Sequence, residues 1–417
     1  MQIFNTNYPT QQTIYALAIC VFIVNTTRAD SDWPGFLGPG GNPVSSSSLP
    51  TEFRVSSEDQ TAEHIGWRTE LPGRSVSGPI VVDGKVITTS SGGIEGRWMY
   101  TTAVDQKTGD VIWQRSARST GRPYCHPSSA NAAPTPCTDG KHVYSFFSSN
   151  DLICYDLSGN LKWFLSLTDI HPLAGNDVGM SASPAVGGGV VVVTVECQAD
   201  SFAAGIDAET GEVLWDITRP SKANWCSPRI RIDESGKGIA LLQGSRELQA
   251  VELTSGQSIW SKELGGSSVV TSLVAGDTIY LPGRGVSALK SPSAFAEPTE
   301  SWNSNRLSPG SASLVATKFG LIGLKRPSIL VCCDESGEQK WNVRLKDVGQ
   351  VWATPVVADD QLYLFSMSGK CLTVKLTDEA AEVVATSELG EEVLGSPAVV
   401  DGAMYVRSVD ALWKISE

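Results

Sequence analysis

Residues 103–113 read AVDQKTGDVIW: an apolar strand, an acidic turn with Gly109, and a second strand that carries Trp113. A close copy, GIDAETGEVLW, occupies residues 205–215, and a third runs from 250 to 260. Two shorter copies lose one turn residue and lie at 156–163 and 334–341. A repeat of roughly 45 residues leaves room for four short strands and their turns. The chain is therefore expected to be built from repeated four-stranded units.

Each unit opens with a short apolar strand after a Ser-Pro or similar pair, and proline is tolerated there because no ladder donor is lost. Tight turns such as Asp83-Gly84 and Asp401-Gly402 follow, and such pairs suit two-residue hairpins. Counting these openings gives eight units that begin near residues 77, 131, 181, 225, 268, 310, 353 and 395. The fold is predicted to be all-β, an eight-bladed β-propeller of four-stranded antiparallel blades.

The last unit has only three strands before the chain ends at Glu417, whereas residues 65–71 form a strand without a unit of its own. We predict that this N-terminal strand completes the eighth blade, because pairing the two ends removes the exposed edges. The outer strand of a unit carries a tryptophan, which is expected to bury against the neighbouring blade. These structural blade-docking residues are Trp67, Trp113, Trp163, Trp215, Trp260, Trp302 and Trp341. Unit five has Trp302 without an acidic turn, and unit seven has Val384 where a tryptophan is expected.

Three segments are expected along the chain. Residues 1–29 resemble a signal peptide, with an apolar run from Ile14 to Val24 that is too short to span a bilayer and small residues up to Ala29. No Lys or Arg precedes residue 28, so a frayed apolar N-terminus is the alternative interpretation. Residues 30–64, rich in Gly, Pro and Ser, are expected to form an irregular arm, and residues 65–417 the propeller. The expected location is periplasmic or secreted.

Charge and cysteine content exclude several classes of partner and site. The formal net charge is -13, which disfavours nucleic acid and an anionic membrane surface as partners. The chain has 9 cysteines, and those after residue 29 are even in number, so disulfides are permitted but their pairing is open. With only 4 histidines and no C-x-x-C pair, a structural zinc site is not expected.

With the repeat laid out, the chain resembles the pyrroloquinoline-quinone-like (PQQ-like) propeller repeat proteins. The resemblance covers about residues 32–417 and is carried by DWPGF at 32–36, IGW at 65–67, APTP at 133–136 and GSPAVVDG at 395–402. Exported propeller proteins of planctomycete bacteria are the nearest resemblance, and outer-membrane assembly-factor propellers a more distant one. The wider family implies two alternative roles: quinoprotein dehydrogenases hold PQQ and calcium on the axis, whereas assembly factors bind proteins and hold no cofactor.

The residues favour the second role. Adjacent cysteines are typical of the dehydrogenases, but Cys332-Cys333 falls on a strand that leads into a turn, where consecutive side chains point to opposite faces. A calcium ion needs roughly six to eight oxygen ligands, and the sequence shows no cluster of residues that could be assigned to such a site. The turn aspartates, such as Asp105, recur in the well-preserved units and so belong to the turn. No cofactor, metal or catalytic residue is predicted, and PQQ with calcium enters only under the alternative.

Non-repeating polar and aromatic residues in the long connections are the candidate binding residues, because loops on a rigid frame commonly carry binding. They are Arg97, Trp98, Arg122, Tyr124, His126, His171, Asn176, Asp177, Asp200, Trp225 and Arg284. The sequence predicts a non-catalytic, exported, monomeric scaffold that binds an envelope protein or a small ligand. The alternative is a PQQ-dependent quinoprotein oxidoreductase with a reduced or rearranged site. A polysaccharide hydrolase lacks an identifiable carboxylate pair.

Overall fold

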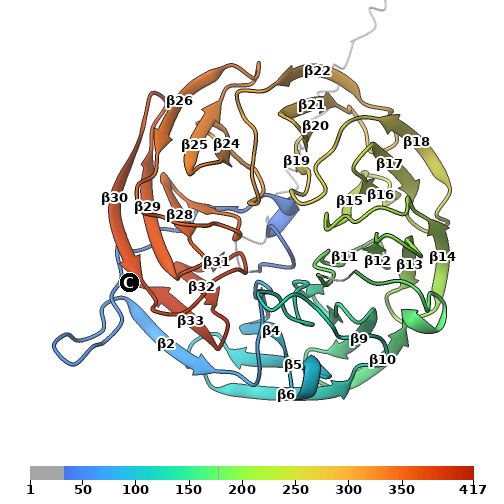
Figure 1. Cartoon of the computed structure of the whole chain (residues 1–417), viewed down its shortest axis with the longest axis horizontal. Coiled ribbons are helices and arrows are strands. Elements are labelled where there is room, and N and C mark those ends of the chain that lie inside the picture. Colours follow the sequence, from blue (N-terminus) through green and yellow to red (C-terminus); the bar gives the residue numbers. More distant parts are fainter. Residues whose placement is uncertain (1–31, 177) are drawn as a thin grey trace, which may run out of the picture.

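The computed structural model describes residues 32–176 and 178–417, and it confirms the predicted eight-bladed β-propeller. Seven of the blades are four-stranded sheets, and the remaining one, blade 7, has a fifth strand from the arm. The sheets stand around a common axis with their shortest strands innermost (Figure 1). The predicted signal peptide lies outside the described residues. Within those residues, no helix is long and apolar enough to cross a membrane.

From the axis outward, each of the first four blades uses consecutive strands. These are β3 (Ile80–Val82), β4 (Lys85–Gly92), β5 (Trp98–Asp105) and β6 (Val111–Arg118); β7 (Cys137–Thr138), β8 (His142–Phe146), β9 (Asp151–Asp156) and β10 (Leu161–Ser166); β11 (Ala185–Gly187), β12 (Val190–Val195), β13 (Phe202–Asp207) and β14 (Val213–Thr218); and β15 (Arg229–Ile232), β16 (Gly238–Gln243), β17 (Glu247–Glu252) and β18 (Ser258–Glu263).

Blades 5 to 8 follow the same plan until the last outer strand, which comes from the N-terminal part of the chain. The strands are β19 (Leu273–Ala275), β20 (Thr278–Pro282), β21 (Val286–Lys290) and β22 (Thr299–Ser304); β23 (Val315–Thr317), β24 (Gly320–Lys325), β25 (Ile329–Cys333) and β26 (Gln339–Arg344); β27 (Val356–Ala358), β28 (Gln361–Phe365), β29 (Lys370–Leu376) and β30 (Ala381–Glu388); and β31 (Ala398–Val400), β32 (Ala403–Arg407), β33 (Ala411–Ser416) and β2 (Ile65–Glu70).

The ring is closed by β2, as the sequence predicts. This strand pairs antiparallel with β33, with Arg68 opposite Trp413 and Glu70 opposite Ala411. The Arg68 guanidinium also lies 5.2 Å from the centre of the Trp413 ring and pairs with Glu391 at 2.7 Å. The two ends of the propeller are therefore held in one sheet, and neither β2 nor β33 presents a free edge toward the other.

Neighbouring blades are joined by a tryptophan of one and a turn glycine of the next. Trp113 on β6 of blade 1 covers Gly159 in the β9–β10 turn of blade 2, and its indole N–H donates to the Leu157 carbonyl at 3.0 Å. Gly159 has φ of 81°, and a Cβ there would lie 2.7 Å from the indole ring. Glycine is thus required both by the backbone and by the ring above it. The same contact joins Trp67 to Gly109, Trp163 to Gly211, Trp215 to Gly256 and Trp302 to Gly337.

The remaining blade junctions differ from this pattern because the turn of the following blade differs in sequence. Trp341 donates to the Thr377 carbonyl at 3.2 Å, whereas the buried Trp260 faces a unit without the acidic turn, and its Nε1 has no acceptor. In blade 7 the sequence places Val384 in the tryptophan position, but the strand register gives that position to Ala385, opposite Thr373. Val384 is instead the exposed residue of the β-bulge. Blade 8 has no β33–β2 turn for an indole to cover, because its outer strands come from opposite ends of the chain.

A second set of junctions surrounds the axis where the inner strands begin. A backbone N–H at the start of one blade donates to a buried Ser or Thr hydroxyl in the next, as from Thr135 to Ser183 at 3.0 Å and from Ser183 to Ser227 at 2.9 Å. Further bonds of this kind join Gly78 to Thr135, Ser227 to Thr271, Ser313 to Thr354, and Thr354 to Ser396. Apart from Thr271, each of these hydroxyls belongs to the residue before a proline, and all of them satisfy backbone donors between blades.

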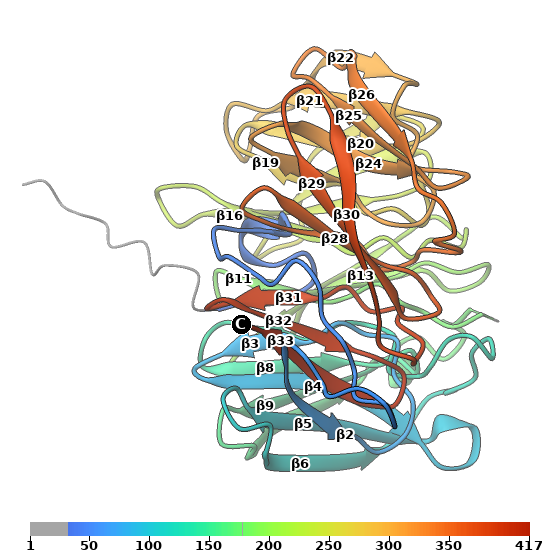
Figure 2. The same cartoon turned by 90° about the vertical axis from the view of Figure 1, so that its left-hand side faces the viewer.

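The N-terminal arm crosses the axis at the face opposite the long connections (Figures 1 and 2). Trp33 pairs with Val81 of blade 1, and β1 (Val44–Ser45) adds a parallel strand to β27 of blade 7. Between them lies the short helix η1 (Pro39–Gly41), beside which the Phe36 carbonyl accepts from Arg229 of blade 4 at 3.3 Å. The arm thus contacts inner strands on several sides of the axis.

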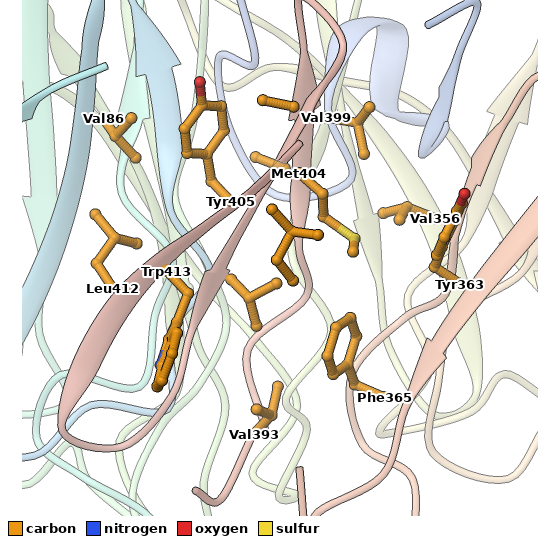
Figure 3. Packing of buried hydrophobic residues seen from close by; sticks show 14 of the residues in the cluster. Val86, Val356, Tyr363, Phe365, Val393, Val399, Met404, Tyr405, Leu412 and Trp413 are labelled. Atoms are coloured by element: carbon orange, nitrogen blue, oxygen red, sulfur yellow. The ribbon is translucent and has the colours of Figure 1, made fainter. Parts of the chain in front are cut away.

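The apolar core is divided into layers between blades. The largest cluster joins blades 7, 8 and 1, and Figure 3 shows Val86 of blade 1 in the same group as Tyr405 and Leu412 of blade 8. Ile87, the next residue along β4, instead packs with Val143 of blade 2. Alternate residues of a central strand thus face opposite neighbouring blades, as the period of a strand requires.

Candidate functional site

The connections between blades and the loops between second and third strands emerge on one face of the ring, which we call the loop face. Up-and-down strands place these two kinds of connection at the same end, and the tight hairpins and the arm at the other (Figure 2). The described candidate residues from the sequence belong to loop-face connections, except Trp98, which is the first residue of β5 at this face. Asp177 lies outside the described residues.

An arginine-rich hollow of about 530 Å³ lies on the loop face between blades 1 and 2. Its wall includes Arg97, which follows helix η2 (Ile94–Gly96), and Arg118 at the end of β6. Arg122 and Tyr124 form another part of the wall, with the guanidinium carbon 4.9 Å from the centre of the phenol ring. Glu95 also lines the hollow and pairs with Arg97 at 3.0 Å. The residues that line this hollow thus include three arginines and one glutamate.

The connections around this hollow contact one another directly. The Asn131 side chain donates to the Gly96 carbonyl at 3.3 Å, and the His126 backbone N–H donates to the Val178 carbonyl at 3.2 Å. From the next connection, the Trp225 indole donates to the Gly179 carbonyl at 2.8 Å. The loops of blades 1 to 4 therefore form one continuous layer and bring together several of the sequence candidates.

His171 and Asp200 meet at the edge of this layer. The His171 ring stacks on Phe202 with centroids 3.8 Å apart, and its two nitrogens lie 3.1 Å from Asp200 Oδ2 and 2.5 Å from Asp216 Oδ2. A ring held on both nitrogens and one face has little freedom, so this group fixes the connection from blade 2 against blade 3. The sequence singles out two of these four residues and misses Phe202 and Asp216.

The other candidates are separate from this group. Asn176 is buried and accepts the Val178 backbone N–H at 3.1 Å, which shapes its own turn. His126 is exposed, and its Nδ1 contacts the Ser128 hydroxyl at 2.7 Å. Arg284 belongs to the β20–β21 loop of blade 5 and is not part of the layer over blades 1 to 4.

Large apolar side chains exposed on the loop face are the features that sequence reasoning missed. Ile94 is 83% exposed and Leu173 is 74% exposed, and Ile170 and Val178 in the same connection as Leu173 are exposed as well. Trp98 and Tyr124, both predicted candidates, are also about half exposed. An apolar residue next to a turn glycine, as in Gly93-Ile94, is the one sequence signal that could have found this surface.

A buried ionic network supports the loops from below. Arg219, 1% exposed in its side chain, donates to Glu196 at 2.8 Å and to Glu247 at 2.9 Å. Glu196 also accepts from Asn224 at 3.1 Å, which draws the connection before β15 onto β12. Burial raises the pKa of the Glu196 carboxyl despite the nearby Arg219. The network joins blades 3 and 4 at the base of the loop layer.

The quinoprotein resemblance implies two features, a calcium ligand set and a disulfide between adjacent cysteines, which can be compared with the described residues. In residues 32–176 and 178–417, no group of three or more His, Cys, Asp or Glu side chains is placed to hold a metal ion. Cys332 packs in the cluster toward blade 7 and Cys333 in the cluster toward blade 5, and both are free thiols. Burial raises the pKa of both thiols, to about 12 and about 11. The two cysteine side chains therefore leave opposite faces of β25, as the strand period predicts.

A family model described as outer membrane protein assembly factor BamB matches this chain over residues 54–173, 102–282 and 302–416. No curated protein sequence matches the chain.

Solved structures share the fold at low sequence identity. The structure of BamB from Moraxella catarrhalis aligns with a TM-score of 0.61 at 16% identity, over 84% of this chain and 96% of the other. A europium-containing methanol dehydrogenase aligns at 0.63 and 12% identity, over 92% and 91%. Quinohemoprotein alcohol dehydrogenase from Comamonas testosteroni aligns at 0.67 and 13% identity, over 93% and 81%. These likenesses support the fold and do not distinguish binding from catalysis.

Proposed function

Because the chain belongs to the family of outer membrane protein assembly factor BamB, we propose that it is an exported, non-catalytic scaffold that binds a partner protein of the cell envelope. The loop face over blades 1 to 3 is the proposed binding surface. The observation that carries this proposal is the group of exposed apolar side chains beside the arginine-rich hollow.

Exposed apolar surface of this kind is typical of interaction sites. Large apolar patches on soluble proteins mark contact surfaces, and aromatic and arginine residues are enriched in the energetically important part of an interface. Ile94, Trp98 and Tyr124 supply the apolar and aromatic contacts, while Arg118 and Arg122 line the adjoining hollow. A partner segment that presents apolar side chains next to carboxylates would match this arrangement.

Contacts within the loop layer support binding without large rearrangement. The connections are tied to one another by side-chain hydrogen bonds and rest on the Arg219 network. Preorganised loops lose less conformational entropy on association, which favours affinity. The side chains that project from this layer are therefore available to a partner at low cost.

The test compares two double variants of the full chain in cell-envelope extracts. Ile94→Ser with Leu173→Ser removes apolar contacts from the loop face, and Leu161→Ser with Leu214→Ser removes exposed apolar residues from outer strands β10 and β14. All four side chains are exposed, so both variants should fold. The partner captured by the wild-type chain should be lost with the first variant and retained with the second. Equal capture by both variants would contradict the loop-face assignment.

The alternative function is a PQQ-dependent oxidoreductase, and a separate measurement addresses it. Calorimetry and absorbance with added PQQ and calcium should show no stoichiometric binding, and artificial electron acceptors should not be reduced. Tight stoichiometric binding accompanied by dye reduction would replace the scaffold proposal with the quinoprotein one.

A further inference from the structure

Unpartnered buried polar atoms are concentrated at the junction between blades 8 and 1. Among the described residues, the buried side-chain atoms without a hydrogen-bond partner include Nε and Nη2 of Arg407, Oγ of Ser90 and Oγ1 of Thr102. Arg407 is 0% exposed, and the two hydroxyl residues are 1% exposed. Native proteins seldom leave such groups unsatisfied, so each needs a partner that the protein atoms do not supply.

Ser90 and Thr102 face blade 8. On β4 and β5, Val86 and Val104 belong to the cluster shared with blade 8, whereas Ile87 and Ala103 belong to the cluster shared with blade 2. Strand alternation gives Ser90 the same face as Val86, and Thr102 the same face as Val104. Thr101, one residue away, confirms the alternation, because its hydroxyl donates to Ser145 of blade 2 at 2.9 Å.

Arg407 faces blade 1 from the other side of the junction. Tyr405, two residues earlier on β32, lies 6.0 Å from Trp67 between ring centroids, and Trp67 covers the Gly109 turn of blade 1. By the same alternation, the Arg407 side chain leaves β32 on the side of Tyr405. Above it, the chain between β2 and β3 closes the junction, where the Leu71 N–H donates to the Asp410 carbonyl at 3.0 Å.

No carboxylate of the described residues lies within ion-pair distance of the Arg407 guanidinium. Its Nη1 donates to the carbonyls of Ser408 and Ala411, but no ion pair among the described residues includes Arg407. Asp410 and Glu391 are the nearest acidic groups acting on it, and Glu391 is already bound by Arg68 and the Ser408 hydroxyl. Burial lowers the pKa of Arg407 to about 10, so the side chain stays protonated at neutral pH. A buried cation without a direct anionic contact is unfavourable.

We propose that a small monovalent anion of the halide class binds between blades 8 and 1, held by Arg407 Nε and Nη2 and by the hydroxyls of Ser90 and Thr102. A guanidinium has only donors, and both hydroxyls can donate, so an acceptor-only ligand satisfies all four groups at once. The negative charge offsets the buried cation, which a water molecule does not. The anion contacts both blades that the chain ends bring together, so its binding stabilises the closed ring.

Bromide provides the direct test because its position can be seen by anomalous X-ray scattering. Crystals of the full chain grown without halide and soaked in sodium bromide should show an anomalous peak in contact with Arg407 and Ser90. Water density at that position with no anomalous peak would overturn the proposal, and so would a guanidinium bonded directly to Ser90 or Thr102.

Solution measurements test the energetic consequence. Replacing gluconate by chloride at constant ionic strength should raise the melting temperature of the wild-type chain by roughly 2 °C per tenfold increase in chloride above the dissociation constant. Ser90→Ala keeps the cation and removes one donor, so a higher chloride concentration should be needed for the same shift. Ser272→Ala is the matched control, because Ser272 is also buried with an unpartnered hydroxyl but lies in blade 5. A wild-type melting temperature that does not depend on chloride would contradict the proposal.

Discussion

Replacing Gly159 with alanine should destabilise the propeller more than the same change at Gly140. Both glycines have positive φ, 81° and 87°, so an alanine at either position costs about 1–2 kcal/mol of backbone strain. The loss of unfolded-state entropy on adding a methyl group is also common to both. At Gly140 nothing lies within 4 Å of the added Cβ, whereas at Gly159 the Cβ would lie 2.7 Å from the Trp113 ring. The indole has to move, and overpacking of this kind costs about 1–3 kcal/mol.

The difference between the two variants therefore isolates the contact between blades. We expect Gly159→Ala to be less stable than Gly140→Ala by about 1–3 kcal/mol. Guanidinium-induced unfolding followed by tryptophan fluorescence gives both free energies of unfolding, provided that the slopes of the two transitions agree. Near-ultraviolet circular dichroism should also report a displaced indole in Gly159→Ala alone. Equal destabilisation of the two variants would refute the reasoning that the turn glycine seats the tryptophan of the preceding blade.

Three further predictions concern closure, the axial hydrogen bonds and the buried thiols. Deleting residues 65–70 removes β2 and leaves β33 as an open edge, so the protein should self-associate, as measured by size-exclusion chromatography with light scattering. A monomer that melts cooperatively would argue against ring closure by this strand. Ser183→Ala leaves the buried Thr135 backbone N–H unsatisfied and should lower the free energy of unfolding in denaturant by about 1–3 kcal/mol. Ser272→Ala should cost less, because the buried Ser272 hydroxyl has no partner to lose. The reverse order of the two variants would contradict this account. Burial raises the pKa of Cys332 to about 12 and that of Cys333 to about 11, from an ordinary 9.0, so above pH 9.0 the unfolded chain loses thiol protons that the folded chain keeps. The free energy of unfolding should therefore fall between pH 9.0 and about 12, by less than about 1.4 kcal/mol per thiol and pH unit. Replacing both cysteines by alanine should flatten this slope in pH-dependent unfolding measurements, and an unchanged slope would speak against it.

Most of the fold can be predicted from the repeat, because each residue of the repeat has one structural role. The turn aspartate accepts backbone N–H groups, as Asp207 does from Thr210 at 2.8 Å, and the turn glycine leaves space for an indole. These residues recur at a fixed spacing, so the number of blades and the closure by β2 can be predicted. The register within a strand is less accessible, because a β-bulge shifts it by one residue. That shift is the reason Val384 is exposed and Ala385 holds the position expected for a tryptophan.

The candidate site is harder to predict because its residues meet through loops. His171 contacts Asp200 in the β12–β13 loop and Asp216 on strand β14, and nothing in the spacing of these residues indicates that they converge. Arg407 occupies an ordinary strand position, and only the three-dimensional packing shows that it is buried without a carboxylate. The exposed Ile94 and Leu173 break the usual polar character of loops, but a sequence alone does not say which face they share.

The pairing of the first strands with the last blades has a consequence for biosynthesis. Arg68 finds Glu391 323 positions later, and Leu49 accepts a hydrogen bond from Tyr363 314 positions later. The N-terminal segment is synthesised first and stays unpaired until almost all of the remaining residues have been synthesised. Pairing between residues so distant in the sequence forms slowly, and until it forms the unpaired strand edges are prone to aggregation. Truncation near the carboxyl terminus would accordingly deprive both ends of their partners, and a chaperone that shields the leading ribbon would be most valuable during this interval.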